Sequence, residues 1–246
     1  MTISKKILIT GASSGVGSSL VTHLRERFHV IAIARRLEKM TEMFGGDPRV
    51  ECHRVDIGCR QELERFMANL MLQHGSIPYL INNAGILVRE SMEELRVEDI
   101  EQSLAVNAIA PHIILNALLP TMRSQSFGRV INLTSGAPFN CFPGFAAYSA
   151  SKGALNALTV TAAKENANLD IKINLMSPGP VRSEMSPEAP MEPDACHPTV
   201  DYLLSLPRDG ATGRFFWLGR ELPFSPDFDG VQWLAGTASD RFPLVI

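Results

Sequence analysis

The chain has 246 residues, 45% of them hydrophobic, a formal net charge of −3 and an isoelectric point near 6.1. This much apolar material is enough for one large α/β core, and the charge balance argues against a surface for nucleic acid or for a membrane. The segment "AVNAIAPHIILNALLP" is too interrupted by Asn, His and Pro to span a bilayer, and no stretch matches a secretory signal. The four cysteines lack metal-ligand spacing, which predicts reduced thiols, no metal and a cytoplasmic protein.

Short apolar runs alternate along the chain with segments long enough to be helices. The runs are nearly continuous in apolar residues, as expected for strands that are covered on both faces. This alternation predicts an α/β fold: a doubly wound parallel sheet with helices on both faces, in a single Rossmann-type domain over 1–246. The predicted strands are 6–10, 29–34, 50–57, 79–84, 129–134, 171–176 and 214–219. The predicted helices are 15–28, 60–75, 97–125 and 146–168.

The first predicted strand runs into a glycine-rich turn, "TGASSGVG". Glycine permits a tight turn and lets backbone N–H groups approach an anion at the start of the next helix. The turn is not a Walker A loop, because Ser18 and Ser19 follow Gly17, and its GxxxGxG spacing differs from GxGxxG. The pattern predicts a phosphate-binding site, with a plain strand-to-helix turn as the alternative.

The next two strands end in residues suited to an adenosine. The strand over 29–34 is followed by Arg35 and Arg36, where an acid would favour the free 2′-hydroxyl of NAD and an arginine favours the 2′-phosphate of NADP. The following strand ends in "VDI", where Asp56 is able to accept from an adenine amino group. The alternatives are two solvated arginines and, for Asp56, a helix N-cap.

A tyrosine and a lysine stand four residues apart in "YSASK". On a helix, Tyr148 and Lys152 share one face. A phenol with its ordinary pKa of about 10 transfers a proton poorly at neutral pH, and a nearby ammonium lowers that value. The pair is therefore a candidate general acid/base, and Ser135 at the end of "NLTS" is a candidate donor to a carbonyl oxygen. The alternative is a surface Tyr and Lys on an amphipathic helix.

Together these segments resemble the classical short-chain dehydrogenase/reductase (SDR) family. The resemblance covers nearly the whole chain, from "TGASSGVG" through "NNAG", "VN", Ser135, "YSASK" and "PGPVRSEM", in the family's order and spacing. It implies an oxidoreductase that uses NADP(H), with NAD(H) less favoured, to interconvert a ketone and a secondary alcohol by hydride transfer. A non-catalytic NADP(H)-binding regulator of the same fold is the alternative.

The resemblance also implies roles for individual residues. Tyr148 would be the acid/base, and Lys152 would bind the nicotinamide ribose and lower the Tyr148 pKa. Ser135 would polarise the carbonyl, and Asn107 would hold a water in a proton relay behind Lys152. The residues implied to surround the cofactor are Gly11, Ser13, Ser14, Gly15, Val16, Gly17, Arg35, Arg36, Asp56, Ile57, Asn83, Ala84, Gly85, Tyr148, Lys152, Pro178, Gly179, Val181 and Ser183.

Three features depart from the family pattern. Ser183 stands where many members have Thr, and Ser14 stands where many NADP-dependent members have a basic residue, so the NADP prediction depends on the two arginines. The C-terminal part keeps "TG" but not the usual short ending. The proline-rich stretch 178–207 is expected to be an irregular excursion over the carboxyl ends of the strands, which predicts a substrate-loop region around 180–210.

The substrate and the assembly are less constrained. Six apolar residues are candidates for a hydrophobic substrate pocket, with ordinary packing as an equal alternative. They are Phe139, Cys141, Phe142, Phe145, Met185 and Met191. The segments 111–122 and 152–163 are apolar on more than one helical stripe. With the resemblance, this predicts a homodimer or homotetramer that acts on a small-molecule carbonyl or alcohol.

Overall fold

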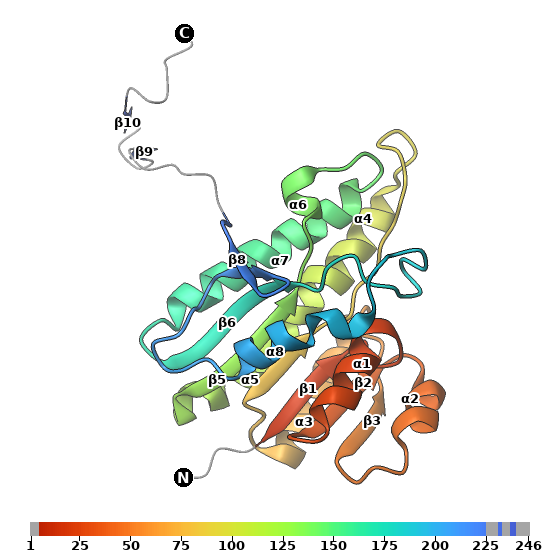
Figure 1. Ribbon diagram of the computed structural model, residues 1–246, viewed down its shortest axis with the longest axis vertical. Helices are drawn as coiled ribbons and strands as arrows, with labels where there is room; N and C mark the ends of the chain where they lie inside the picture. Colours follow the sequence, from red (N-terminus) through yellow and green to blue (C-terminus); the bar gives the residue numbers. More distant parts are fainter. Residues whose placement is uncertain (1–4, 225–230, 233–236, 240–246) are drawn as a thin grey trace.

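A single mostly parallel sheet forms the centre of the computed structural model, which describes residues 5–224, 231–232 and 237–239 (Figure 1). The eight strands lie in the order β3-β2-β1-β4-β5-β6-β7-β8, and only β8 is antiparallel to its neighbour. The chain order reverses between β1 and β4, which is the topological switch point of a doubly wound sheet. The strands are β1 (Lys6–Thr10), β2 (His29–Ala34), β3 (Val50–Arg54), β4 (Tyr79–Asn82), β5 (Phe127–Leu133), β6 (Asp170–Ser177), β7 (Phe215–Trp217) and β8 (Arg220–Leu222).

Helices cover both faces of this sheet, so the predicted fold class is confirmed. One face packs against α1, α2 and α8, and the other packs against α3, α5 and α7. In Figure 1, α1 and α8 lie on the near side of the sheet. The helices are α1 (Gly15–Leu24), α2 (Leu37–Phe44), α3 (Arg60–His74), α4 (Val97–Leu104), α5 (Ala110–Gln125), α6 (Ala137–Asn140), α7 (Ala146–Glu165) and α8 (His197–Leu204).

A π-helical turn, Ala105–Ile109, joins α4 to α5 into one continuous helical run over 97–125. This run reaches the length and mean hydropathy (1.4) of a membrane-crossing helix, and 44% of that window is buried inside the fold. A core helix of a globular domain meets the same criterion, so the match by itself indicates little. π-Turns inside α-helices are frequent at functional sites.

The proline-rich stretch is more ordered than predicted. It contains a 3₁₀ turn, Pro193–Cys196, followed directly by α8. Pro193 and Pro198 stand in the first turns of these elements, where the missing N–H is not needed. The part before residue 193 is irregular and is held by two isolated bridges, Val181 to Met191 and Ser183 to Ser186.

The C-terminal part departs from the predicted parallel pattern. β8 folds back on β7 as an antiparallel edge strand, and β9 (Val231–Gln232) and β10 (Thr237–Ala238) form a separate two-stranded pair. Most of the unusual C-terminal ending, residues 225–230, 233–236 and 240–246, lies outside the described residues.

Candidate active site

A cavity of about 740 Å³ opens at the switch point between β1 and β4. Its volume lies in the range of cofactor and ligand sites. Of the predicted site residues, all but two line it; Gly17 and Asn107 lie behind the wall. Those that line it are Gly11, Ser13, Ser14, Gly15, Val16, Arg35, Arg36, Asp56, Ile57, Asn83, Ala84, Gly85, Ser135, Tyr148, Lys152, Pro178, Gly179, Val181 and Ser183.

The glycine turn needs its glycines for two different reasons. Gly11 and Gly15 have φ of +70° and +54°, a left-handed conformation that favours glycine. Gly17 packs so closely that a Cβ there would lie 2.1 Å from the Gly11 carbonyl oxygen. Ser14 is the N-cap of α1 but makes no capping hydrogen bond. The first N–H groups of α1 are therefore without a side-chain acceptor, which suits an anionic ligand.

The "NNAG" segment is tied to the first strand by the side chain of Thr10. The Thr10 hydroxyl accepts from the backbone N–H groups of Asn83 and Ala84 at 3.0 and 2.9 Å. The Asn83 amide in turn donates to the Thr10 carbonyl at 2.9 Å. These bonds fix the crevice between β1 and β4 at the place where the strand order reverses.

Asn107 lies in the π-turn and is fully buried. Its Oδ1 accepts from the Ile86 N–H at 2.8 Å, and its Nδ2 donates to the Ile86 carbonyl and to the Ser151 hydroxyl, both at 2.9 Å. The side chain thus connects α7 to the loop after "NNAG". The predicted relay water stays a prediction; the contacts present assign Asn107 a positioning role.

Lys152 is 4% exposed and reaches the cavity from α7. Its ammonium donates to the Leu133 carbonyl at 2.7 Å and lies 5.9 Å from the centre of the Tyr148 ring. Burial lowers the pKa of Lys152 to about 8. A lysine with that pKa loses its charge within the pH range in which enzymes are assayed.

Tyr148 and Ser135 meet at the same end of the cavity. Burial raises the pKa of Tyr148, and a hydrogen bond with the Ser135 side chain opposes this shift only in part. The expected lowering of the Tyr148 pKa by Lys152 is not found: desolvation is the largest effect on this buried phenol, and the opposing effect comes from Ser135. The structure does bring the predicted acid/base, carbonyl donor and lysine together.

At the opposite end of the cavity, Arg36 holds several groups in place. Its guanidinium donates to the hydroxyls of Ser13 at 3.2 Å and Ser14 at 2.8 Å, and to the Glu184 carboxylate. Arg35 also lines the cavity but is exposed. Asp56 lines the cavity while its carboxylate accepts from the Gly58 N–H at 2.9 Å, so it forms a local turn rather than the helix N-cap.

Sequence reasoning missed several residues of this site. Glu184 and Ser186 line the cavity from the loop after β6, and Arg89 and Gln102 also line it. Ser151 supports Asn107. Their positions follow from contacts between distant segments and carry no local pattern. Lys39 donates to Glu184 Oε1 at 3.1 Å. Its place could have been predicted from the sequence, because it follows Arg36 by one turn of α2.

Only two of the six candidate pocket residues line the cavity: Phe145 and Met185. Phe139 packs instead against the rings of Phe215 and Phe224, and Met191 packs against the core on the α8 side. Cys141 and Phe142 are exposed outside the cavity. The apolar wall is therefore smaller than predicted, because the segment 139–142 turns outward before α7 begins.

A doubly wound sheet with a glycine turn at its switch point and a Tyr–Lys–Ser cluster in the same cavity defines a dinucleotide-dependent oxidoreductase fold. The family model of the short chain dehydrogenases matches residues 5–193. The chain therefore belongs to the short-chain dehydrogenase/reductase family, and the resemblance found in its sequence is confirmed.

Individual relatives agree with this assignment. An uncharacterised oxidoreductase of Staphylococcus saprophyticus is 29% identical over 232 residues, covering 86% of this chain and 94% of the relative. The structure of a 4-hydroxyisoleucine dehydrogenase complexed with NADH matches with a TM-score of 0.81 and 27% identity, over 87% of this chain and 96% of that one. A metagenomic short-chain oxidoreductase in complex with NADP matches with a TM-score of 0.76 and 28% identity, over 87% and 97%. Both solved structures therefore hold a nicotinamide cofactor, NADH in one and NADP in the other.

Proposed function

We propose that the protein is an NADP(H)-dependent reductase or dehydrogenase that interconverts a small-molecule ketone and a secondary alcohol. The observation that carries this proposal is the meeting of Tyr148, Ser135 and Lys152 at one end of the cavity at the switch point. Two of these groups are hydrogen-bond donors to a reacting oxygen, and the third is a buried cation beside the phenol. Apolar side chains would stabilise this part of the fold better than these three polar groups, so their presence points to a role in chemistry.

The residues fit a dinucleotide. Gly11 and Gly15 let the backbone approach the pyrophosphate, and the uncapped start of α1 offers N–H groups to it. Gly85 lies at the end of the cavity near Lys152. A side chain there would crowd the site, because its Cβ would lie 3.1 Å from Asn107 Oδ1 and 3.5 Å from Lys152 Nζ. When bound, the dihydronicotinamide ring would supply the hydride.

The chain's own residues would handle the carbonyl oxygen and its proton. In the direction of reduction, the Ser135 and Tyr148 hydroxyls donate to the carbonyl oxygen and stabilise the negative charge that develops there. Tyr148 then transfers its phenolic proton to that oxygen, which yields the alcohol and leaves a phenolate. The Lys152 ammonium stabilises the phenolate until solvent returns the proton. Asn107 holds the loop at Ile86 against Ser151 of α7. It thereby fixes the separation between this loop and α7 at the end of the cavity where Tyr148 and Lys152 lie.

The preference for NADP(H) over NAD(H) is supported by the cations at the adenosine end. Arg36 is aimed at the glycine turn, Arg35 lines the same wall, and no acid replaces them at the end of β2. Guanidinium groups bind phosphate through charge-assisted hydrogen bonds. The charge balance and the four free cysteines support a cytoplasmic location.

A screen of carbonyl compounds that follows NADPH absorbance tests this function. We expect turnover of at least one ketone class, with NADPH bound in the cavity. A protein that binds NADPH but turns over no carbonyl or alcohol would favour the regulator, and a protein that binds no nicotinamide nucleotide would overturn both readings.

A further inference from the structure

The loop after β6 places a carboxylate among the cations of the adenosine end. Both oxygens of Glu184 accept from Arg36 Nη1, at 2.9 and 2.8 Å. Lys39 Nζ donates to Glu184 Oε1 at 3.1 Å. The Glu184 carboxylate therefore engages two cations that follow β2 and lie 148 and 145 positions away along the chain.

A tight turn holds Glu184 in this place. The backbone N–H of Ser183 donates to the Ser186 carbonyl at 3.2 Å, and that of Ser186 donates back at 3.1 Å, so Glu184 and Met185 form the tip. The turn lies against the glycine turn, because a Cβ on Gly15 would lie 3.1 Å from the Ser183 Cβ. The Glu184 side chain and the glycine turn are thus two walls of one space, with Arg36 bridging them.

Three cations, Arg35, Arg36 and Lys39, and two acids, Glu184 and Asp56, lie at this site. Arg36 and Lys39 pair with Glu184, whereas Arg35 lines the same cavity and forms no ion pair with the residues that the structure describes. Asp56 also lines the cavity, but its carboxylate is held by the Gly58 N–H. A phosphate and the Glu184 carboxylate require the same N–H donors, and two anions at one site repel each other.

We propose that Glu184 is a cofactor-specificity residue whose carboxylate competes with the 2′-phosphate of NADP(H) for Arg36 and Lys39. When NADP(H) binds, its 2′-phosphate displaces the Glu184 carboxylate, and the ion pairs of Glu184 with Arg36 and Lys39 are lost. NAD(H), which carries a neutral 2′-hydroxyl, leaves these ion pairs intact. Glu184 thereby narrows the preference that the cations alone would give. This inference rests on the proposed function, since it requires a nicotinamide nucleotide in this cavity.

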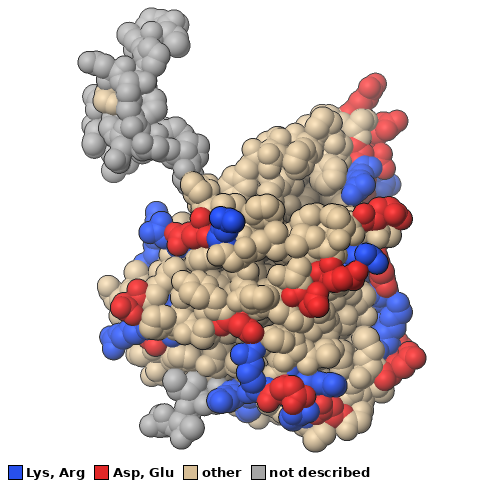
Figure 2. Space-filling model, in the orientation of Figure 1, with Lys and Arg blue, Asp and Glu red and all other residues tan. Residues whose placement is uncertain are grey.

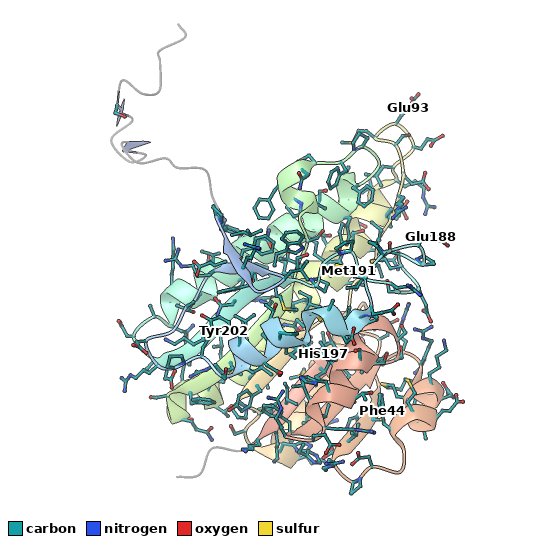
Figure 3. All side chains as sticks on the ribbon, in the orientation of Figure 1. Phe44, Glu93, Glu188, Met191, His197 and Tyr202 are labelled. Atoms are coloured by element: carbon teal, nitrogen blue, oxygen red, sulfur yellow. The ribbon has the colours of Figure 1, made fainter. Side chains whose placement is uncertain are left out.

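The test is to replace Glu184 with glutamine and measure binding by calorimetry. Glu184→Gln keeps the shape of the side chain and removes the charge. Glu188→Gln is the matched control, because this substitution changes the net charge by the same amount. Glu188 is exposed and lies at the outer end of the same loop, as Figure 3 shows. The ligands are NADPH, NADH, 2′,5′-ADP and 5′-AMP, so that each pair differs only by the 2′-phosphate.

We expect Glu184→Gln to tighten NADPH and 2′,5′-ADP about three- to tenfold, the scale of two partly exposed ion pairs. NADH and 5′-AMP should change less than about twofold on the same basis, and Glu188→Gln should leave all four ligands nearly unchanged. Equal tightening of both members of a pair, weaker NADH binding, or an equal effect of Glu188→Gln would overturn the inference.

The outcome separates this inference from the proposed function. If the unmodified protein binds NADPH and Glu184→Gln binds it no better, only the role of Glu184 falls. If the unmodified protein binds no nicotinamide nucleotide, the proposed function falls with it.

Discussion

The two ends of the cavity are held by different kinds of interaction. At the catalytic end, Asn107 and Lys152 are buried and are fixed by hydrogen bonds to backbone carbonyls. At the adenosine end, the side chains of Arg36 and Glu184 are 41% and 57% exposed and are held by ion pairs. Buried polar groups are costly to release, whereas exposed ion pairs contribute little and exchange easily. The catalytic end is therefore preorganised, and the adenosine end can adapt to its ligand.

Acidic and basic side chains alternate on the face drawn in Figure 2, with no large patch of one sign among the described residues on that face. On this face the charges therefore give no field of a single sign that would steer a charged nucleotide.

The strongest way to break this comparison is to remove the phenol at the catalytic end. Tyr148→Phe should lower kcat by about 10²- to 10⁴-fold, the range of one general acid/base. The NADPH Kd should stay nearly constant, because only the transferable proton is lost. Tyr202→Phe, on the outer side of α8, is the control and should leave kcat unchanged. Near wild-type turnover by Tyr148→Phe would remove the tyrosine from the mechanism.

A change at the adenosine end should have the opposite signature. Arg36→Asp should lower the preference for NADPH over NADH by about tenfold to a hundredfold, since one hydrogen bond to a charged group contributes about 1.5–3 kcal/mol. The effect should appear in kcat/KM and not in kcat at saturating cofactor. Arg35→Asp, which lacks the contacts to Ser13 and Ser14, should flatten the preference less. Equal kcat/KM for NADPH and NADH in the unmodified protein would count against both.

The division also explains what the sequence could predict. The parallel sheet follows from the alternation of apolar runs with helix-length segments. The glycine turn and the Tyr148–Lys152 pair each depend on the spacing of residues within one short segment, so pattern and motif were sufficient to predict them. The Glu184–Arg36 contact joins residues 148 positions apart, and an exposed acid in a proline-rich loop gives no signal of its partner. The raised pKa of Tyr148 was missed for another reason, because burial depends on how α7 packs. The sequence therefore predicted which residues line the site, but not the ion pair of Glu184 with Arg36 or the direction of the Tyr148 pKa shift.

The pH dependence of reduction should sharpen the contrast. Tyr148 stays protonated because burial raises its pKa, so the alkaline limb of kcat should follow the loss of charge on Lys152 near pH 8. Above that value the rate should fall by a factor approaching tenfold per pH unit. The measurement is kcat with NADPH from pH 6 to 10.

Thermal melts separate this loss from unfolding. The folded pKa of Lys152, about 8, lies below its ordinary value of 10.5, so between these values the unfolded chain binds more protons. The contribution of Lys152 to the free energy of unfolding therefore rises with pH in that window. A rate that stays flat to pH 9.5 would contradict the assignment of the limb to Lys152.

The smallest expected effect concerns assembly, which extends the comparison to the outside of the catalytic helices. The π-turn that carries Asn107 ends at Ile109, which is 47% exposed, and α7 presents Leu158, which is 40% exposed. Apolar side chains on these helices leave an outer stripe that the sheet does not cover, and two-fold packing against a second subunit would bury it. Such packing would also support the π-turn from behind, and hence the catalytic end rather than the adenosine end. We expect light scattering to give two or four times the chain mass of 27.0 kDa. Leu158→Glu should shift the mass toward the single chain, while Leu72→Glu, at an 86% exposed position on α3, should not. A mass of 27.0 kDa for the unmodified protein would show that this stripe is left without a second subunit.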